Sequence, residues 1–201
     1  MMSLEPSAPV LCLASASPRR RDLLWQLGVP HTTTAADLDE RVQAGEAPHE
    51  YVERLALEKA IAVRARGERL PVLAADTAVV LAGAVYGKPT DRADALAMLG
   101  RLSGRTHEVL TAVALANERS VEVRISVTSV RLRELTLAER EAYWQTGEPR
   151  DKAGSYAIQG FGAAFIESIS GSYTGVVGLP LAETAELLRT AGLVYWRGRG
   201  A

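Results

Sequence analysis

Cysteine is almost missing from this sequence, since Cys12 is the one example among 201 residues. A lone cysteine cannot form a disulfide within the chain, so nothing in the sequence indicates an oxidising compartment. Long apolar runs are missing as well, because no segment approaches the roughly 20 apolar residues that a membrane-spanning helix needs. The early apolar run, residues 10–14, is short for a secretory signal, and no basic residue precedes it. A soluble cytoplasmic protein with no membrane partner is expected.

There is also no excess of positive charge. The chain has 23 Lys and Arg residues against 24 Asp and Glu residues, which gives a net charge of -1. Binding to a nucleic acid polymer depends on a clear basic excess, so we expect no such partner. With 47% hydrophobic residues and no long polar tract, the chain is expected to form one domain, residues 1–201, with frayed ends at 1–8 and 197–201.

Several familiar catalytic patterns are absent too. The sequence contains no GxxxxGK[ST], no GxGxxG, no CxxC, no HExxH and no GxSxG. His107 stands at the start of a predicted strand without a serine or cysteine nucleophile pattern, so a structural role is expected for it. These absences favour chemistry by charge and positioning over covalent catalysis.

What is present includes one acid inside an apolar segment. Asp76 lies between residues 72–75 and 79–81, which are apolar and have the length of a buried strand. An ionised carboxylate there is costly unless a cation or a metal meets it. In the alternative interpretation Asp76 ends a short strand and begins a turn, but the apolar run resumes at once. We therefore interpret Asp76 as a functional acid.

The remaining pattern predicts a mixed α/β fold. Strands are predicted at 10–14, 72–81, 106–116, 121–132 and 165–169, helices at 18–27, 48–66, 92–101, 137–146 and 180–189, and loops at 31–46 and 171–178. Apolar residues alternate with charged or polar ones along 121–127. This alternation indicates that the hairpin of 106–116 and 121–132 has one wet face.

A cluster of arginines opens the first predicted helix. Ser17 is a suitable N-cap and Pro18 suits the first helical position, and Arg19, Arg20 and Arg21 follow directly. Cations oppose the dipole at a helix N-terminus, so an anion held there would relieve the penalty. A solvated basic turn explains the same residues equally well.

Further polar residues interrupt apolar surroundings. Lys59 lies within the apolar stripe of helix 48–66, so it either extends to the rim or reaches an internal anion. Gln159 is the one amide in a glycine-bracketed apolar run, where it could match a nucleobase edge or be a satisfied buried glutamine. The turn formed by Gly87-Lys88-Pro89 and Asp91 presents a cation, Lys88, and an acid, and Lys152 lies in a charged loop.

Together these cations and acids suit a polyphosphate with a divalent metal, because phosphates need charge neutralisation and Mg²⁺ or Mn²⁺ prefers oxygen ligands. The second acid would be Glu40, from the acidic cluster in loop 31–46, provided that this loop faces Asp76. The spacing of the residues does not decide that point.

Six ordered blocks carry a resemblance to a known family. They are LASASPRRRDLL, YVERLALEKA, LAADTAVVLAGAVYGKPTD, MLGRLSGRTHEVLTAV, TGEPRDKAGSYAIQGFGAAFI and GSYTGVVGLPL. Across nearly the whole chain the sequence resembles the Maf family of nucleoside triphosphate pyrophosphatases. The resemblance implies an elongated, two-lobed α/β fold around a mixed twisted sheet with a central cleft, related to the inosine triphosphatase type. It also implies a homodimer.

The resemblance assigns roles by position. Asp76 matches the family's proton acceptor, and Asp76 with Glu40 would hold the divalent metal. Residues tied to substrate choice are Arg19, Thr77 and Gln159, and those placed with the phosphates are Ser15, Arg20, Lys59 and Lys88. Thr after the catalytic Asp and Gln in IQG resemble the branch that hydrolyses dTTP and UTP to monophosphate and pyrophosphate.

Other functions stay open at this stage. A 7-methyl-GTP-selective Maf pyrophosphatase would differ at the same specificity positions. A nucleotidyl transferase would use similar charges but pass the nucleotide to an acceptor. The resemblance also raises a non-enzymatic role in septum formation, with a possible part in cell division arrest.

Overall fold

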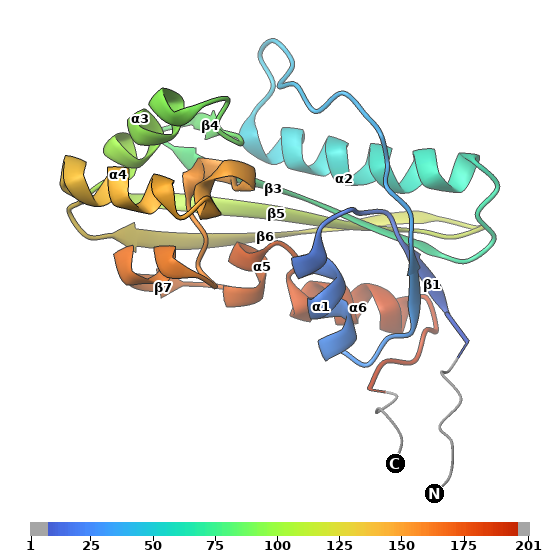
Figure 1. The fold of residues 1–201 in the computed structure, drawn as a ribbon. Helices are drawn as coiled ribbons and strands as arrows, with labels where there is room; N and C mark the ends of the chain where they lie inside the picture. Colours follow the sequence, from blue (N-terminus) through green and yellow to red (C-terminus); the bar gives the residue numbers. More distant parts are fainter. Residues whose placement is uncertain (1–7, 197–201) are drawn as a thin grey trace, which may run out of the picture.

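The structure is a computed structural model that describes residues 8–196. Its centre is a mixed sheet with the strand order β2-β1-β3-β5-β6-β7, and β4 pairs with β3 beside this path. The strands are β1 (Leu11–Leu13), β2 (His31–Thr33), β3 (Val72–Leu81), β4 (Ala84–Tyr86), β5 (Thr106–Ala116), β6 (Val121–Leu132) and β7 (Ile166–Ser170). Figure 1 shows the long strands β3, β5 and β6 running through the length of the molecule.

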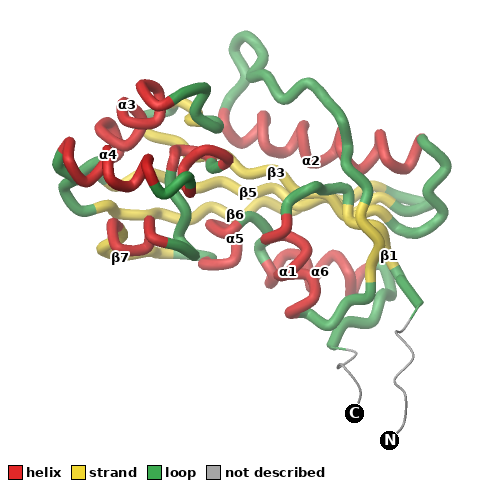
Figure 2. The backbone as a smooth tube through the Cα atoms, viewed as in Figure 1, coloured by secondary structure: helices red, strands yellow, loops and turns green. Residues whose placement is uncertain are grey.

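Helices cover both faces of this sheet. They are α1 (Pro18–Gln26), α2 (Pro48–Ala65), α3 (Arg92–Leu102), α4 (Leu137–Gln145), α5 (Tyr173–Val177) and α6 (Leu181–Thr190), with three short 3-10 helices at Glu148–Asp151, Ala153–Ser155 and Phe161–Phe165. In Figures 1 and 2, α2 lies along one face, whereas α1, α5 and α6 lie on the other side, with α1 and α6 toward β1. The mixed α/β fold expected from the sequence is confirmed.

β3 is a strand because its residues pack in two alternating sets. Successive side chains in a strand point to opposite faces. Val72, Ala74, Ala78 and Val80 pack in one core with α2. The odd-numbered residues pack on the other face, at 73 and 75 with α1 and α6 and at 79 with α3 and α4. Asp76 therefore belongs by position to the α2 face, and Thr77 belongs to the opposite face.

One edge of β3 is paired at both ends and open in the middle. Residues 72–73 pair with β1 in parallel, and residues 79–81 pair with β4 in antiparallel fashion. Within the described part of the chain, no strand covers residues 74–78 on this edge. On the other edge, β5 pairs with β3 continuously from residue 72 to residue 80. The open edge lets side chains from both faces reach one space.

Several predicted elements agree with the structure, and others were wrong. The strands 72–81, 106–116 and 121–132 are confirmed at both ends. The loop expected at 31–46 contains β2, which pairs with β1 in parallel. The glycine-rich loop expected at 171–178 contains α5, whose N-cap Ser172 accepts a hydrogen bond from Gly175. Both elements are shorter than the window over which periodicity can be recognised.

The expected wet face of the β5–β6 hairpin is also corrected. Val123 and Ile125 pack against the α2 core, so α2 covers their face there. Farther along the same face Val127 is 53% exposed, whereas Ser126 and Thr128 on the opposite face are buried. Different helices cover the two ends of the hairpin, so the solvent-exposed face differs from one end to the other.

The expectation of frayed ends falls on residues 1–7 and 197–201, which lie outside the described residues, while Ala8 lies in neither a helix nor a strand. Among the described residues no helix is both long enough and apolar enough to cross a membrane.

Candidate active site

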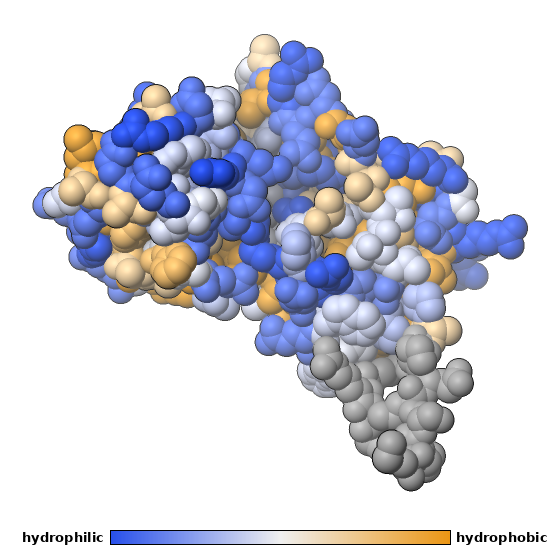
Figure 3. All heavy atoms as spheres, in the orientation of Figure 1, coloured by the Kyte–Doolittle hydropathy of each residue, from blue (hydrophilic) through white to orange (hydrophobic). Residues whose placement is uncertain are grey.

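A pocket of about 650 Å³ opens at the uncovered edge of β3. Its lining comes from β3, from the turn before α1, from the loop before α2, from Gly87 and Lys88 and from the segment 151–159. Figure 3 shows the surface hollowed in this region, with hydrophilic residues around the hollow. The volume lies in the range typical of small-molecule sites, about 300–1,000 Å³.

Asp76 is held on the α2 side of the pocket by a buried cation. Its side chain is 10% exposed, and Lys59 Nζ lies 2.6 Å from Asp76 Oδ1. The same Nζ lies 2.6 Å from Glu40 Oε1, so one ammonium group joins two carboxylates. Burial raises the pKa of Asp76, and the charges of Lys59 and Arg20 oppose that rise. Lys59 therefore reaches an internal anion, and the rim alternative is wrong.

Glu40 does face Asp76, which was the condition set by the sequence. Loop 34–47 is tied to α2 by two side chains that sequence analysis did not single out. Tyr51 donates from its hydroxyl to the Glu40 carbonyl at 2.9 Å. Arg54 binds Glu46 through Nε and Nη2 and donates to the Arg41 carbonyl at 3.2 Å. These contacts fix the loop so that the Glu40 carboxylate meets Lys59. Contacts of this kind between a loop and the next helix leave no periodic signal.

The two carboxylates are a suitable pair for a divalent cation. Mg²⁺ usually takes one or two protein carboxylates and completes its shell with water and substrate phosphates. Among the described residues there is no cluster of three or more His, Cys, Asp or Glu side chains that could hold a metal by itself. The donor set of Asp76 and Glu40 thus fits a metal that arrives with a phosphate ligand.

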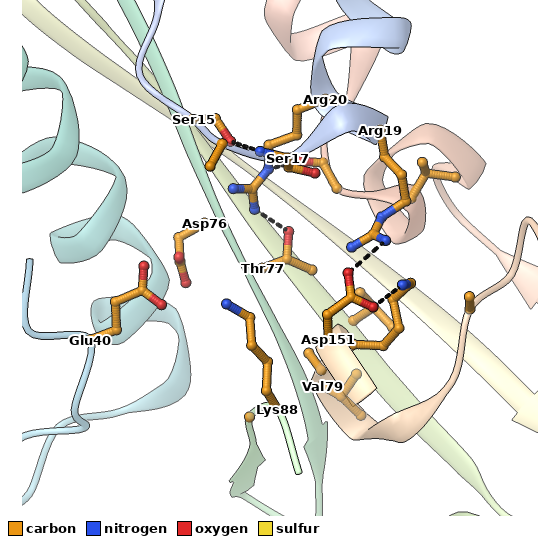
Figure 4. A pocket seen from close by; sticks show the side chains of 18 of the residues that line it. Ser15, Ser17, Arg19, Arg20, Glu40, Asp76, Thr77, Val79, Lys88 and Asp151 are labelled. Atoms are coloured by element: carbon orange, nitrogen blue, oxygen red, sulfur yellow. Dashed lines mark hydrogen bonds and ion pairs between the residues drawn. The ribbon is translucent and has the colours of Figure 1, made fainter. Parts of the chain in front are cut away.

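Thr77, on the other face of β3, belongs to a network of uncharged acceptors around Arg20. Arg20 donates from Nε to the Gly178 carbonyl at 2.7 Å and from Nη2 to Thr77 Oγ1 at 3.2 Å. Thr111 Oγ1 lies 3.0 Å from Thr77 Oγ1 and 2.8 Å from the Gly175 carbonyl oxygen. Figure 4 shows Thr77 and Arg20 on one side of β3, with Asp76 and Glu40 on the other. Neutral oxygens of the protein thus hold Arg20 through Nε and Nη2.

The backbone conformation favours glycine at position 178. Its φ is 125°, a region that L side chains rarely adopt. A Cβ at this position would lie 3.5 Å from Arg20 Nε and 3.7 Å from Thr77 Oγ1, at ordinary contact distance from the network. The chain therefore passes close to the guanidinium at this point, and its carbonyl can accept from Arg20.

The N-terminus of α1 opens into the same pocket. Ser17 occupies the N-cap position as expected, but its side chain makes no capping hydrogen bond. Instead the Ser17 N–H donates to Ser15 Oγ at 3.1 Å. Both Ser15 and Ser17 line the pocket, as do Arg19 and Arg20, whereas Arg21 is exposed beside Asp22. The solvated-turn alternative is wrong for Arg20 and holds for Arg21.

Other predicted residues lie around the opening of the pocket. Arg19 pairs with Asp151 across the opening at 3.4 Å, and Asp151 also pairs with Lys152. Lys88 is exposed and lines the pocket, and in Figure 4 its side chain points into the space between the two groups of residues. Gln159 is exposed at the rim, so the buried-glutamine alternative is wrong.

Two residues named from the sequence lie elsewhere. Asp91 is the N-cap of α3 and accepts a hydrogen bond from the Asp94 N–H at 2.8 Å. His107 is 2% exposed, and its Nε2 lies 2.8 Å from the Tyr156 hydroxyl. Burial lowers the pKa of His107 to about 4. The structural role expected for His107 agrees with this position, because it packs behind Tyr156 and does not line the pocket.

Comparison with known proteins identifies the family. The family model described as "Maf-like protein" matches residues 10–191. The chain belongs to the Maf family. Its relatives include a dTTP/UTP pyrophosphatase from Hahella chejuensis, 50% identical over 199 residues that cover 98% of this chain and 99% of the relative. Another, from Bordetella parapertussis and with the same name, is 51% identical over 204 residues, covering 95% and 97%.

The Maf resemblance expected from six sequence blocks is thereby confirmed. A third dTTP/UTP pyrophosphatase, from Saccharophagus degradans, is 50% identical over 191 residues that cover 93% of this chain and 91% of the relative. The match extends from β1 to α6 and so includes every segment that lines the pocket. The Maf pocket described here is therefore built from matched sequence throughout.

Proposed function

We propose that this Maf protein hydrolyses the nucleoside triphosphates dTTP and UTP to the nucleoside monophosphate and pyrophosphate. The observation that carries the proposal is the placement of Asp76. A buried carboxylate faces a pocket that also receives Arg19, Arg20, Lys88 and Lys152. Phosphoryl chemistry of this kind needs positioned cations and a proton acceptor more than it needs a covalent nucleophile.

Asp76 is the group that would take the proton from the attacking water. Lys59 occupies Oδ1, and within residues 8–196 no group donates a hydrogen bond to Oδ2. As water attacks the α-phosphorus, its proton passes to this carboxylate and the bond to the α–β bridging oxygen breaks. The bridging oxygen leaves with the β-phosphate, so the products are monophosphate and pyrophosphate. Burial raises the pKa of Asp76, and the charge of Lys59 opposes that rise and so favours the ionised carboxylate, which is the form that accepts a proton.

Asp76 and Glu40 would hold a divalent cation, Mg²⁺ or Mn²⁺. When bound, such an ion neutralises phosphate charge and polarises the phosphorus–oxygen bonds. Arg19, Arg20 and Lys88 would balance the remaining charge of the triphosphate from the opposite wall of the pocket. Ser15 and the free N-terminus of α1 offer neutral donors beside these cations.

The nucleobase would lie toward the segment 156–159. Gln159 is exposed at the rim, so its amide is free to offer a donor and an acceptor to a pyrimidine edge. Tyr156 and Ile158 line the same part of the pocket and supply apolar surface. The names of the relatives, dTTP/UTP pyrophosphatases, support a pyrimidine at this place.

A substrate panel tests the proposal. The protein is incubated with dTTP, UTP, CTP or 7-methyl-GTP and with Mg²⁺ or Mn²⁺, without any acceptor, and pyrophosphate and monophosphate are measured. We expect equal amounts of the two products from dTTP and UTP and little turnover of the other two. Turnover only after addition of an acceptor would point to a nucleotidyl transferase, and a preference for 7-methyl-GTP would point to the other branch. Asp76→Asn serves as the inactive control.

A further inference from the structure

Thr111 is a fully buried hydroxyl that the mechanism above does not use. It lies in the middle of β5, is 0% exposed and does not line the pocket. In the sheet register it is directly opposite Thr77, and Ser126 of β6 is directly opposite Thr111. Three hydroxyl residues thus form a row across adjacent strands. Burying a hydroxyl is costly unless it is hydrogen-bonded, so the partners of Thr111 need an explanation.

The carbonyl of Gly175 needs a donor because α5 ends early. If the helix continued, the N–H of Leu179 would donate to Gly175, but it donates to the Thr174 carbonyl at 3.0 Å. The Gly175 carbonyl instead accepts from Thr111 Oγ1 at 2.8 Å. An unpaired buried carbonyl costs about 1–3 kcal/mol. The hydroxyl of Thr111 is therefore directed to α5.

The Thr111 hydroxyl also connects this carbonyl to Arg20. It faces two acceptors, the Gly175 carbonyl at 2.8 Å and Thr77 Oγ1 at 3.0 Å. The Arg20 guanidinium can only donate, and it donates to the same Thr77 oxygen at 3.2 Å. The Thr77 oxygen therefore lies between two donors, Thr111 on one side and Arg20 on the other.

We propose that Thr111 is a positioning residue for the pocket: its hydroxyl lies between the Gly175 carbonyl and Thr77 Oγ1 and so holds the Thr77 oxygen where it accepts from the Arg20 guanidinium. The Gly178 carbonyl, three residues after Gly175, holds Arg20 Nε at 2.7 Å. α5 and the residue after it thus help to hold Arg20 at both Nε and Nη2. Thr77 acts on substrate choice through the Arg20 side chain that it holds. This inference rests on the proposed function.

The test compares two buried threonines that face α5. Thr111→Val keeps the shape and removes the hydroxyl, whereas Thr111→Ser keeps the hydroxyl. Thr128→Val is the matched control, because Thr128 is 1% exposed and its hydroxyl donates to Ser172, which caps α5. Inorganic pyrophosphate with Mg²⁺ is the probe, and its dissociation constant is measured by calorimetric titration. Steady-state kcat and KM for dTTP and thermal unfolding are measured beside it.

We expect Thr111→Val to raise the dissociation constant of pyrophosphate and the KM for dTTP about tenfold, the scale of one charge-assisted hydrogen bond. Thr111→Ser is expected to restore most of the affinity. Thr128→Val is expected to lower the melting temperature but to leave the pyrophosphate affinity within about twofold. If Thr111→Val and Thr128→Val weaken pyrophosphate binding equally, the role of Thr111 is only structural and the inference is overturned.

A double-mutant cycle adds the readout that a structural role would not move. In an Arg20→Ala background, Thr111→Val should cause no further loss of pyrophosphate affinity, because the group that it positions is gone. An additive loss overturns the inference. Should Thr111→Val fail to fold, Thr77→Val is taken through the same cycle with the same expectation. A wild-type protein that binds pyrophosphate but hydrolyses no dTTP would contradict the proposed function alone, since the affinity measurements do not depend on turnover.

Discussion

Two neighbouring residues of one strand, Asp76 and Thr77, stand in surroundings of opposite character. On the α2 face, Asp76 meets Lys59 and, through it, Glu40, so three charges lie within two 2.6 Å contacts. On the opposite face, Thr77 receives Arg20 in a chain of neutral oxygens that ends at a backbone carbonyl. The paired charges thus lie on one face of β3, and the hydrogen bonds that orient Arg20 lie on the other. Side chains from both faces reach one pocket because no strand within the described residues covers this edge of β3 at 74–78.

The comparison suggests a division of labour. The face of β3 that carries Asp76, the acid face, depends on charge. Its contribution to kcat should therefore fall strongly when a charge is removed without a change of shape, and it should depend on pH. The face that carries Thr77, the hydroxyl face, holds Arg20 through neutral oxygens. Substitutions there should therefore lower activity less, and their effect should not depend on pH in the neutral range. Each of the following measurements would either break this division or make it more definite.

The largest effect is expected from Asp76→Asn. The change keeps the shape of the side chain and removes the proton acceptor, so kcat for dTTP should fall by about 10³-fold or more. Release of pyrophosphate is the assay. Asp91→Asn is the matched control, because Asp91 caps α3 outside the pocket and asparagine caps a helix equally well. If Asp76→Asn retained more than about a tenth of the wild-type kcat, the acid face would not be the catalytic one.

Removal of the shared cation is expected to come next. Lys59→Met leaves two carboxylates without their counter-ion. Because the charge of Lys59 lowers the pKa of Asp76, its removal should raise that pKa further. We expect kcat to fall about 100-fold, the acid limb of the kcat/KM profile to move to higher pH, and the unfolding free energy to fall by about 3 kcal/mol. Rate measurements across pH and denaturant unfolding check this. Lost stability with an unchanged pH profile would show that Lys59 does not tune the acid.

On the hydroxyl face the corresponding change is Arg20→Lys. A lysine keeps the charge but cannot serve the Gly178 carbonyl and Thr77 together, as the fork of Arg20 does. We expect kcat/KM for dTTP to fall about tenfold, mainly through KM. Arg21→Lys, on the same helix but exposed, should stay within about twofold of wild type. A loss confined to kcat would show that Arg20 acts in the chemical step, as Asp76 is proposed to do, and would contradict the difference between the two faces.

The smallest effect expected is a difference in the pH dependence of stability. Burial raises the pKa of Asp76, so the folded state binds a proton more tightly than the unfolded state does. Asp76 therefore costs no stability below its ordinary pKa and destabilises the fold as pH rises through the raised pKa. The stability of Asp76→Asn relative to wild type should therefore increase as the pH rises above the ordinary pKa of an aspartate, about 4. Urea unfolding with a chelator present measures it.

Thr77→Val is the comparison for that experiment. It removes a hydroxyl that does not titrate in this range, so its stability relative to wild type should be flat between about pH 4 and pH 8. A slope for Thr77→Val similar to that for Asp76→Asn would mean that the Thr77 hydroxyl itself affects the titration of Asp76. In that case the division between them would have to be abandoned.

Much of the fold could be predicted from local patterns. β3, β5 and β6 have the predicted bounds because long runs of apolar and alternating residues identify strands of ten residues or more. The helix at Pro18 was predicted from its N-terminal proline and its glycine stop, and Gly28 indeed has a φ of 68°. β2 was missed because His31–Thr33 is polar, whereas the equally short β1 lies in an apolar run. α5 was missed because its five residues follow a glycine-rich pattern that is typical of a loop.

The candidate site was predicted in part. Asp76 could be predicted because an ionised carboxylate within an apolar run is costly unless it is paired. Lys59 could be predicted for the same reason, because it interrupts the apolar stripe of its helix. Thr111, Tyr51 and Arg54 were missed because threonine is common in strands and tyrosine and arginine are common on helices. Their importance comes only from the partners that they meet.

Local sequence patterns specify most of the strands and helices, and they show that an acid within one strand needs a cation. The identity of that cation, and the contacts that hold it, depend on how distant segments pack together. Lys59 reaches an acid 17 residues away, and Arg20 reaches a carbonyl 158 residues away. Periodicity is a property of neighbours along the chain, whereas such contacts depend on the order of strands and on the open edge of β3. The same sheet register, which no local pattern specifies, places Thr111 opposite Thr77.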